Sequence, residues 1–451
     1  MTVPTTDEGL QRRLQPRQLT MIAMGSAIGV GLFLGSSVTI RLAGPAVIIS
    51  YLYGALVALV MAYALAEMAV VHPQAGSFGV YADRYLTPWF GFVVRATYGF
   101  IQALAVGAEV VAVAIYMGFW FPAVPQWVWV ASVSAGLVAI NATAVSRFGE
   151  FEYWFALIKV VAIAAFIVVG LSAGFRLQNL TQGEGGFLPN GWTGVWLALT
   201  LVITSYMGVE VVAVTAGEAQ DPQSSIPKAM RTLVFRLIIF YVLAVVVMLA
   251  MTPWRQLAEG GGTITGSPFV RAFSAVGFPY AASAMNFVVI TAALSSANSN
   301  LYLTSRMVFS LSRSGYGPRW LSSVNEAGVP RYAVAAASAG MVAATLLAVL
   351  ARDQAFLALF GTAVAGMLFI WLVILITHLR FRRAMTPADI GRLPIRLPFA
   401  TAAAGFGIVS IVAIAATTFF VDGLRYTVPS FLPFLLVMSI VYVRTYKHAS
   451  Q

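Results

Sequence analysis

The sequence predicts an all-α integral membrane protein with about twelve transmembrane helices. Of its 451 residues, 60% are hydrophobic and only 10% are charged, and the mean hydropathy is +0.85. A soluble globular protein is about half apolar and about a quarter charged. Apolar runs of about 20 residues, the length at which a helix crosses a bilayer, recur along the whole chain. The composition therefore excludes a soluble enzyme.

The apolar runs place the transmembrane segments along the chain. We expect these segments at about residues 18–41, 45–71, 93–120, 125–144, 153–174, 194–217, 232–252, 280–312, 333–351, 356–379, 399–420 and 429–446. The first run is too long for a cleavable signal peptide, and Gly44 and Pro45 lead directly into the second run. We therefore expect the N-terminus to be retained.

The basic residues predict the orientation of the chain in the lipid bilayer. The sequence holds 27 Lys and Arg against 16 Asp and Glu, a net charge of +11. Lys159 falls within a predicted span. Six cations fall in the loops predicted outside, and the remaining 20 of the 27 in those predicted inside. The six outside cations are Arg41, Arg176, Arg255, Arg271, Arg352 and Arg425. This asymmetry favours two cytoplasmic ends and explains the basic charge without a nucleic-acid partner.

Several kinds of chemistry are excluded by residue types that are rare. The chain has no Cys and three His, so disulfides, thiolate metal sites and iron–sulfur clusters are excluded and a metal site is not expected. The glycines between Gly25 and Gly31 follow no strand, so they do not form a dinucleotide-binding loop. No nucleophile, base and metal converge, so we expect neither an enzyme nor a bound cofactor.

Two predicted spans carry small residues near their midpoints, which indicates interrupted helices. The first span contains Gly25, Gly29 and Gly31, and the sixth contains residues 203–210, ITSYMGVE. A close helix-packing face is the alternative for the first, since Gly25 and Gly29 are four residues apart. Spans one and six correspond when two five-helix halves are inverted repeats. A broken helix offers free backbone N–H and C=O groups, which suit the two charges of an amino acid zwitterion.

The correspondence of spans one and six predicts how the chain is divided into repeats and connecting segments. We expect a cytoplasmic tail at 1–17, a first five-helix repeat at 18–174, an external loop at 175–193, a second, inverted five-helix repeat at 194–381, and a last part at 382–451 with a cytoplasmic loop, two helices and a short cytoplasmic tail.

Ionisable residues inside the predicted spans are functional candidates, because each costs about 3 kcal/mol in the bilayer. Lys159 either gains and loses a proton during transport or extends to the inner interface. Glu109 and Glu210 are functional candidates, with capping of free backbone N–H groups or pairing with a neighbour as the structural alternative. For Glu67 and Glu218, nearer to span ends, we favour the structural interpretation. Residues 295–300, SSANSN, place a polar ladder on span eight.

Short motifs run through the chain in a fixed order. They are GSAIGVGLFLGS at 25–36, AGP at 43–45, GSF at 76–78 before YA at 81–82, FGEFEYW at 148–154 with Lys159, GVE at 208–210, AGE at 216–218, DP at 221–222, IP at 226–227, NS at 298–299 and SRM at 305–307. This series resembles the amino acid transporter family of the amino acid–polyamine–organocation superfamily. The resemblance implies the leucine-transporter-type fold, with two inverted five-helix repeats, discontinuous helices one and six, and two peripheral helices.

The resemblance also implies roles for individual residues. Backbone amides of Gly29, Val30 and Gly31 would receive the substrate carboxylate. Carbonyls of Ala27, Thr204 and Met207 would receive its ammonium group. Lys159 and Glu210 match positions of proton coupling, with the proton gradient as driving force. The candidate substrate-binding set is Ala27, Gly29, Val30, Gly31, Glu109, Thr204, Ser205, Met207 and Gly208.

By this resemblance we expect a monomeric proton and amino acid symporter in the bacterial cytoplasmic membrane. Many relatives have Thr in place of Val30 and an aromatic residue in place of Thr204, so the pocket here is expected to be wider or wetter. The stretches around 108–122 and 266–269 favour a neutral, aromatic, proline or histidine-type substrate. An exchanger with the same site and a transporter-like nutrient sensor are the alternatives.

Overall fold

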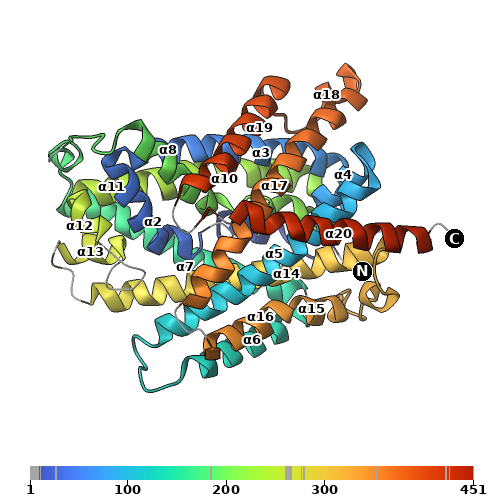
Figure 1. Ribbon diagram of the computed structural model, residues 1–451, viewed down its shortest axis with the longest axis horizontal. Helices are drawn as coiled ribbons and strands as arrows, with labels where there is room; N and C mark the ends of the chain where they lie inside the picture. The colour runs from blue at the N-terminus through green and yellow to red at the C-terminus, as the bar shows by residue number, and fades with distance from the viewer. Residues whose placement is uncertain are drawn as a thin grey trace.

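The computed structural model confirms an all-helical architecture. It describes residues 10–449 except 11, 26–27, 144, 183–184, 260–266, 276, 278–279, 351–353, 422–423 and 426. Over these residues the regular structure is helical, with one isolated backbone bridge between Leu14 and Ala219. The chain ends marked N and C lie toward the same end of the molecule (Figure 1).

The helices follow one another with short connections. The first part contains α1 (Pro16–Gly25), α2 (Val30–Ala43), η1 (Gly44–Ala46), α3 (Val47–Val71), α4 (Ser77–Tyr85), α5 (Pro88–Met117), α6 (Gln126–Asn141), α7 (Val145–Ala173) and η2 (Leu177–Leu180). The middle part contains α8 (Gly191–Val202), η3 (Ile203–Tyr206), α9 (Val211–Thr215), η4 (Ala216–Glu218), α10 (Pro222–Arg236), η5 (Leu237–Leu243), α11 (Ala244–Met251), α12 (Trp254–Ala258), α13 (Pro268–Ala275) and α14 (Ala281–Arg313). The last part contains η6 (Arg319–Ser322), α15 (Arg331–Ala337), α16 (Ala339–Leu350), α17 (Gln354–Ala384), α18 (Pro387–Arg392), α19 (Ala400–Thr417), η7 (Thr418–Phe420) and α20 (Thr427–Ala449).

Each predicted transmembrane segment corresponds to one or more of these helices. Eight stretches of the described chain are long and apolar enough to cross a membrane, and α6 and part of α20 are shorter apolar helices. The first predicted span is divided into α1 and α2, the sixth is divided by η3 and a turn, and the segment 333–351 is divided between α15 and α16. The fold is therefore that of a multi-pass membrane protein with discontinuous spans.

Local sequence explains where several helices begin. The Thr87 hydroxyl accepts from the backbone N–H of Phe90 at 3.4 Å, and Pro88 occupies the first turn of α5. Asp221 caps α10 in the same way, followed by Pro222. The Ser224 hydroxyl, which donates to Asp221, holds the pKa of this exposed carboxyl below its usual value. These caps set the ends of helices that the hydrophobic pattern leaves undefined.

Helices α5 and α14 lie at the centre of the molecule and pack against each other (Figure 1). Helix α7 contacts both α14 and α1, so it connects the central pair to the first interrupted span. The Phe148 ring on α7 stacks on Tyr302 of α14 with 4.1 Å between ring centroids. Buried apolar side chains from most of the helices form one continuous core. The interrupted spans are thus held against a rigid central pair.

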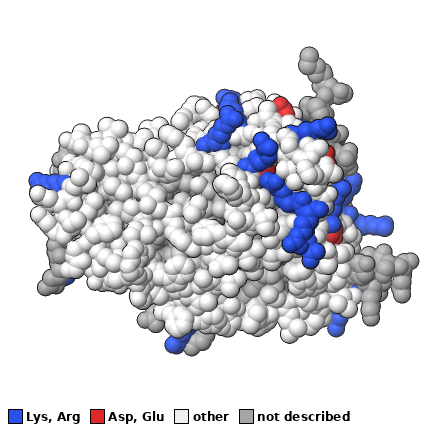
Figure 2. Space-filling model, turned by 90° about the horizontal axis from the view of Figure 1, so that it is seen from above, with Lys and Arg blue, Asp and Glu red and all other residues white. Residues whose placement is uncertain are grey.

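Most exposed cations gather at one end of the molecule. Figure 2 shows Lys and Arg side chains concentrated toward the right-hand end, which is the end of the chain termini in Figure 1. Three of the cations counted with the inside loops are instead buried within the described part of the protein. Arg95, Arg236 and Arg306 are at most 1% exposed and belong to helices inside the protein. They lie in α5, α10 and α14.

Candidate functional site

The first predicted span is interrupted, as the glycine pattern predicts. Helix α1 ends at Gly25, and α2 begins at Val30 after Gly29, whose backbone is extended with φ −109° and ψ −166°. The Ile28 N–H donates to the Gly25 carbonyl at 3.1 Å. The first amides of α2, those of Val30 and Gly31, therefore belong to a helix N-terminus that no side chain caps. Ala27, a predicted carbonyl ligand, lies outside the described residues.

The sixth span is interrupted in the same region of the protein. After α8 the chain tightens into η3, and Met207 then leaves the helical region with φ −58° and ψ 142°. Gly208 has φ +98°, a conformation that requires glycine, and α9 resumes at Val211. The Met207 N–H donates to the Thr204 carbonyl at 3.2 Å. Both predicted helix breaks are therefore confirmed.

The two breaks lie next to each other. Helix α2 contacts η3, and α1 contacts α9. Gly29, Thr204 and Met207 keep partial exposure, although Ser205 and Gly208 beside them are buried. A methyl group added at Gly29 would stand 3.2 Å from Glu109 Oε1. Main-chain groups of both breaks and one carboxylate therefore converge on the same part of the interior.

Gly25 and Gly29 have different neighbours, so the helix-packing alternative describes only one of them. A Cβ at Gly25 would lie 2.5 Å from the Cβ of Ala156 on α7, whereas Gly29 faces the side chains of Glu109 and Ser296. Gly25 thus permits close contact between α1 and α7, and Gly29 faces the interior polar groups.

Gly25→Ala is expected to lower the free energy of unfolding by about 1–3 kcal/mol, because its methyl group would overlap Ala156. Gly35→Ala is the matched control, since a Cβ at Gly35 of α2 meets nothing within 4 Å. Thermal unfolding of both variants in detergent measures the difference. Equal stability of the two variants would contradict close packing at Gly25.

Lys159 belongs to α7, and its side chain reaches the C-terminal end of α1. The residue is completely buried. Its ammonium group donates to the Gly25 carbonyl at 2.5 Å and to Ser295 Oγ at 2.8 Å. The alternative that this side chain extends to the membrane interface is therefore wrong. The ammonium group instead donates to the last carbonyl of α1, which also accepts from the Ile28 N–H, and it connects α1, α7 and α14.

Glu210 is held by the second break. Its carboxylate accepts the Gly208 backbone N–H at 3.0 Å and the Tyr98 hydroxyl at 3.1 Å. Gln102 in turn donates to the Tyr98 hydroxyl at 3.0 Å. Glu210 therefore does cap a free N–H, as the structural alternative predicts, and it also lies in a polar chain that leads into α5. Glu109 Oε2 is buried and has no hydrogen-bond partner among the described residues.

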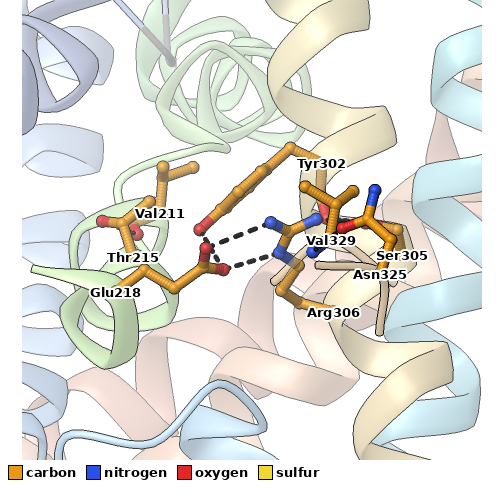
Figure 3. Close-up of polar contacts among 8 residues, drawn as sticks. All are labelled: Val211, Thr215, Glu218, Tyr302, Ser305, Arg306, Asn325 and Val329. Atoms are coloured by element: carbon orange, nitrogen blue, oxygen red, sulfur yellow. Dashed lines mark hydrogen bonds and ion pairs between the residues drawn. The ribbon is translucent and has the colours of Figure 1, made fainter. Parts of the chain in front are cut away.

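Glu67 and Glu218 have basic partners, in accordance with the structural interpretation. Glu67 accepts from His378 and Arg382, each at 2.7 Å. Figure 3 shows Arg306 and Tyr302 of α14 pointing toward Glu218, which accepts from Arg306 Nε at 2.6 Å and from the Tyr302 hydroxyl at 2.7 Å. Both carboxylates fix the ends of spans to neighbouring helices.

Sequence reasoning missed two buried ionisable residues near the breaks. Glu152 lies on α7 two turns before Lys159, and the predicted segment 153–174 started one residue after it. Arg236 is completely buried, and none of its three side-chain nitrogens has a hydrogen-bond partner in the described part of the chain. The spacing of seven between Glu152 and Lys159 places both on one helix face and could have indicated the first.

Comparison with known proteins decides the family. The amino acid permease family matches residues 18–448. This chain belongs to the amino acid permease family. The chain is 39% identical to amino acid permease YtnA of Bacillus subtilis (strain 168) over 427 residues, which are 93% of this chain and 90% of the relative.

Two further relatives of the permease carry names that mention their substrates. The gamma-aminobutyric acid permease of Bacillus subtilis (strain 168) is 37% identical over 432 residues, which are 93% of this chain and 90% of the relative. The aromatic amino acid transport protein AroP of Salmonella typhimurium (strain SL1344) is 39% identical over 385 residues, which are 84% of this chain and 83% of the relative. The protein is therefore a multi-pass amino acid permease, and its family consists of transporters rather than enzymes.

Proposed function

We propose that this permease takes up a neutral, aromatic, proline or histidine-type amino acid together with protons by alternating access. The observation that supports this most directly is the adjacency of the two helix breaks, with the buried ammonium group of Lys159 at the end of α1. Free main-chain N–H and C=O groups can hold the two charges of an amino acid. The lysine adds a group that can gain and lose a proton.

The proposed substrate site lies between the breaks. Amides of Gly29, Val30 and Gly31 at the start of α2 bind the carboxylate, where the helix dipole favours negative charge. Carbonyls of Ala27, Thr204 and Met207 bind the ammonium group. Glu109, Ser205 and Gly208 complete the proposed set, and Glu109 contributes a carboxylate beside Gly29.

Proton coupling is assigned to Lys159 and Glu210. Each lies at one break, completely buried, and each contacts a backbone group that the break leaves without a helical partner. No hydrogen bond or ion pair joins the two residues within the described chain. They are therefore proposed to act at separate points of the transport cycle.

The proposed topology has two inverted five-helix repeats at 18–174 and 194–381, followed by two peripheral helices, in the leucine-transporter-type arrangement. The interruption of the first helix of each repeat supports this division. The cations at the end where both termini lie support cytoplasmic termini in a bacterial cytoplasmic membrane (Figures 1 and 2). We propose that the permease acts as a monomer.

The relatives' names guide the substrate tests. One name specifies aromatic amino acids, and another specifies gamma-aminobutyric acid, which separates the carboxylate from the amine by a longer chain. A thermal-shift screen with the common amino acids and gamma-aminobutyric acid identifies ligands, because a ligand at about 100 times its Kd stabilises the folded state by about 2.7 kcal/mol.

Uptake into proteoliposomes tests the proposed coupling. We expect the identified amino acid to accumulate when the outside is more acidic than the inside, and accumulation to stop when a protonophore removes the gradient. Uptake that does not depend on the pH gradient for any substrate would refute symport. Transport that needs an amino acid on the opposite side, measured as counterflow without net uptake, would identify an exchanger instead.

A further inference from the structure

A buried chain of polar groups starts at Lys159 and runs along α7 and α14. The Lys159 ammonium group donates to Ser295 Oγ at 2.8 Å, and the same hydroxyl donates to Glu152 Oε1. Lys159, Ser295 and Glu152 all have 0% exposure. A serine hydroxyl can accept one hydrogen bond while it donates another. Ser295 therefore connects an ammonium group to a carboxylate through one oxygen atom.

The chain continues beyond Glu152. Asn298 of α14 donates to Glu152 Oε2 at 3.3 Å, and Asn141, the last residue of α6, donates to Asn298 Oδ1 at 2.8 Å. Each step moves toward the same end of the membrane domain. On α7 the path runs back toward Val145, on α14 it runs forward toward Arg313, and it finishes at the connection between α6 and α7.

We propose that Glu152 is the inward proton acceptor of the permease and that Ser295 passes the proton to it from Lys159. This inference rests on the proposed proton coupling. In the step, an N–H bond of the Lys159 ammonium group breaks and an O–H bond forms on Ser295. The original O–H bond of Ser295 breaks, and that proton bonds to Glu152. The amine and the carboxyl group both become neutral, so the step needs no additional reactant.

Charged groups from three helices surround the ammonium end of this path. Glu109 on α5 and Arg236 on α10 act electrostatically on Lys159, together with Glu152 on its own helix. The Gly25 carbonyl of α1 accepts directly from the ammonium group. Movement of α1 away from α7 would remove this acceptor and leave Ser295 as the remaining hydrogen-bond acceptor that the structure gives to Lys159.

A counter-charge role for Glu152 is the competing explanation, and it makes different predictions. A counter-charge lowers the cost of burying Lys159 and needs no hydroxyl between the two groups. A proton path needs both the carboxylate and the hydroxyl. Ser295→Ala therefore separates the two roles, because it removes the hydroxyl and keeps both charges.

The experiment compares two activities of each reconstituted variant. One is accumulation of the labelled amino acid driven by a pH gradient, and the other is counterflow, which requires no net proton release. For Glu152→Gln and Ser295→Ala, we expect the ratio of accumulation to counterflow to fall at least about tenfold. Loss of a hydrogen bond to a charged group corresponds to a change of at least about this size. Ser295→Thr keeps the hydroxyl and is expected to restore the ratio.

Glu150→Gln is the matched control, because Glu150 lies two residues away with a 42% exposed side chain that pairs with Arg17. Its ratio is expected to equal that of the unmodified protein. An unchanged ratio for Ser295→Ala, or a loss of both activities in a Glu152→Gln protein that keeps its unfolding temperature, would overturn the proton path. Absence of gradient-driven accumulation in the unmodified protein would instead refute the proposed symport.

Discussion

Lys159→Ala is expected to reduce pH-gradient-driven uptake at least about tenfold. The substitution removes hydrogen bonds from an ammonium group to Gly25 and Ser295. A hydrogen bond to a charged group contributes about 1.5–3 kcal/mol, and about 1.4 kcal/mol corresponds to a tenfold change. It also removes the group to which the proposed coupling assigns the proton. Initial rates of labelled amino acid uptake into proteoliposomes under an inward pH gradient measure the effect.

Two further variants show whether position or charge matters. Arg147 is exposed on the same helix, so Arg147→Ala removes a cation without reaching the breaks and is expected to leave uptake unchanged. Lys159→Arg keeps a positive charge, but a guanidinium group does not lose its proton in proteins, so uptake is expected to stay low. Full gradient-driven uptake by either Lys159 variant would remove this residue from the coupling mechanism.

Glu218→Gln is expected to lower the free energy of unfolding by about 3–5 kcal/mol. The Glu218 and Arg306 side chains are 0% and 2% exposed, and the guanidinium group also lies 4.0 Å from the centre of the Tyr302 ring (Figure 3). Removing one partner of a buried ion pair leaves the other charge without compensation, which is costly in a low-dielectric environment. Thermal unfolding in detergent at a fixed protein concentration measures the loss.

The control for this prediction is an ion pair that is exposed to solvent. Glu150 pairs with Arg17 at 3.2 Å with side chains 42% and 55% exposed, so Glu150→Gln is expected to change stability by less than about 1 kcal/mol. Combining Glu218→Leu with Arg306→Met removes both charges and is expected to recover most of the lost stability. A Glu218→Gln protein as stable as the Glu150→Gln protein would show that the buried pair contributes little.

The sequence was sufficient for the helical architecture and for the positions of both interruptions, because hydrophobic length and glycine clusters are local signals. Gly208 illustrates this, since its positive φ requires glycine and the pattern around it predicts a break. Contacts between distant segments could not be read from such patterns. Tyr98 and Glu210 are 112 residues apart, and Lys159 and Ser295 are 136 residues apart.

Burial of single charges was the hardest property to predict. Arg236 is counted among the inside cations although it lies near the start of the predicted span 232–252, and the structure buries it where α10 continues into η5. The predicted segment 153–174 starts one residue after Glu152, whereas α7 already begins at Val145. In both cases one charged residue next to an apolar run marks a boundary in the sequence, while tertiary packing decides whether the helix continues.

The backbone bridge between Leu14 and Ala219 has a practical consequence for handling the protein. The Leu14 N–H donates to the Glu218 carbonyl at 3.0 Å, and the Gln220 N–H donates to the Leu14 carbonyl at 3.1 Å. The peptide ahead of α1 is thereby attached to residues 218–220, which follow the interrupted sixth span. Removal of this peptide, or its replacement by a purification tag, would remove both hydrogen bonds. Purification handles and labels therefore belong after α20, where they leave these hydrogen bonds undisturbed.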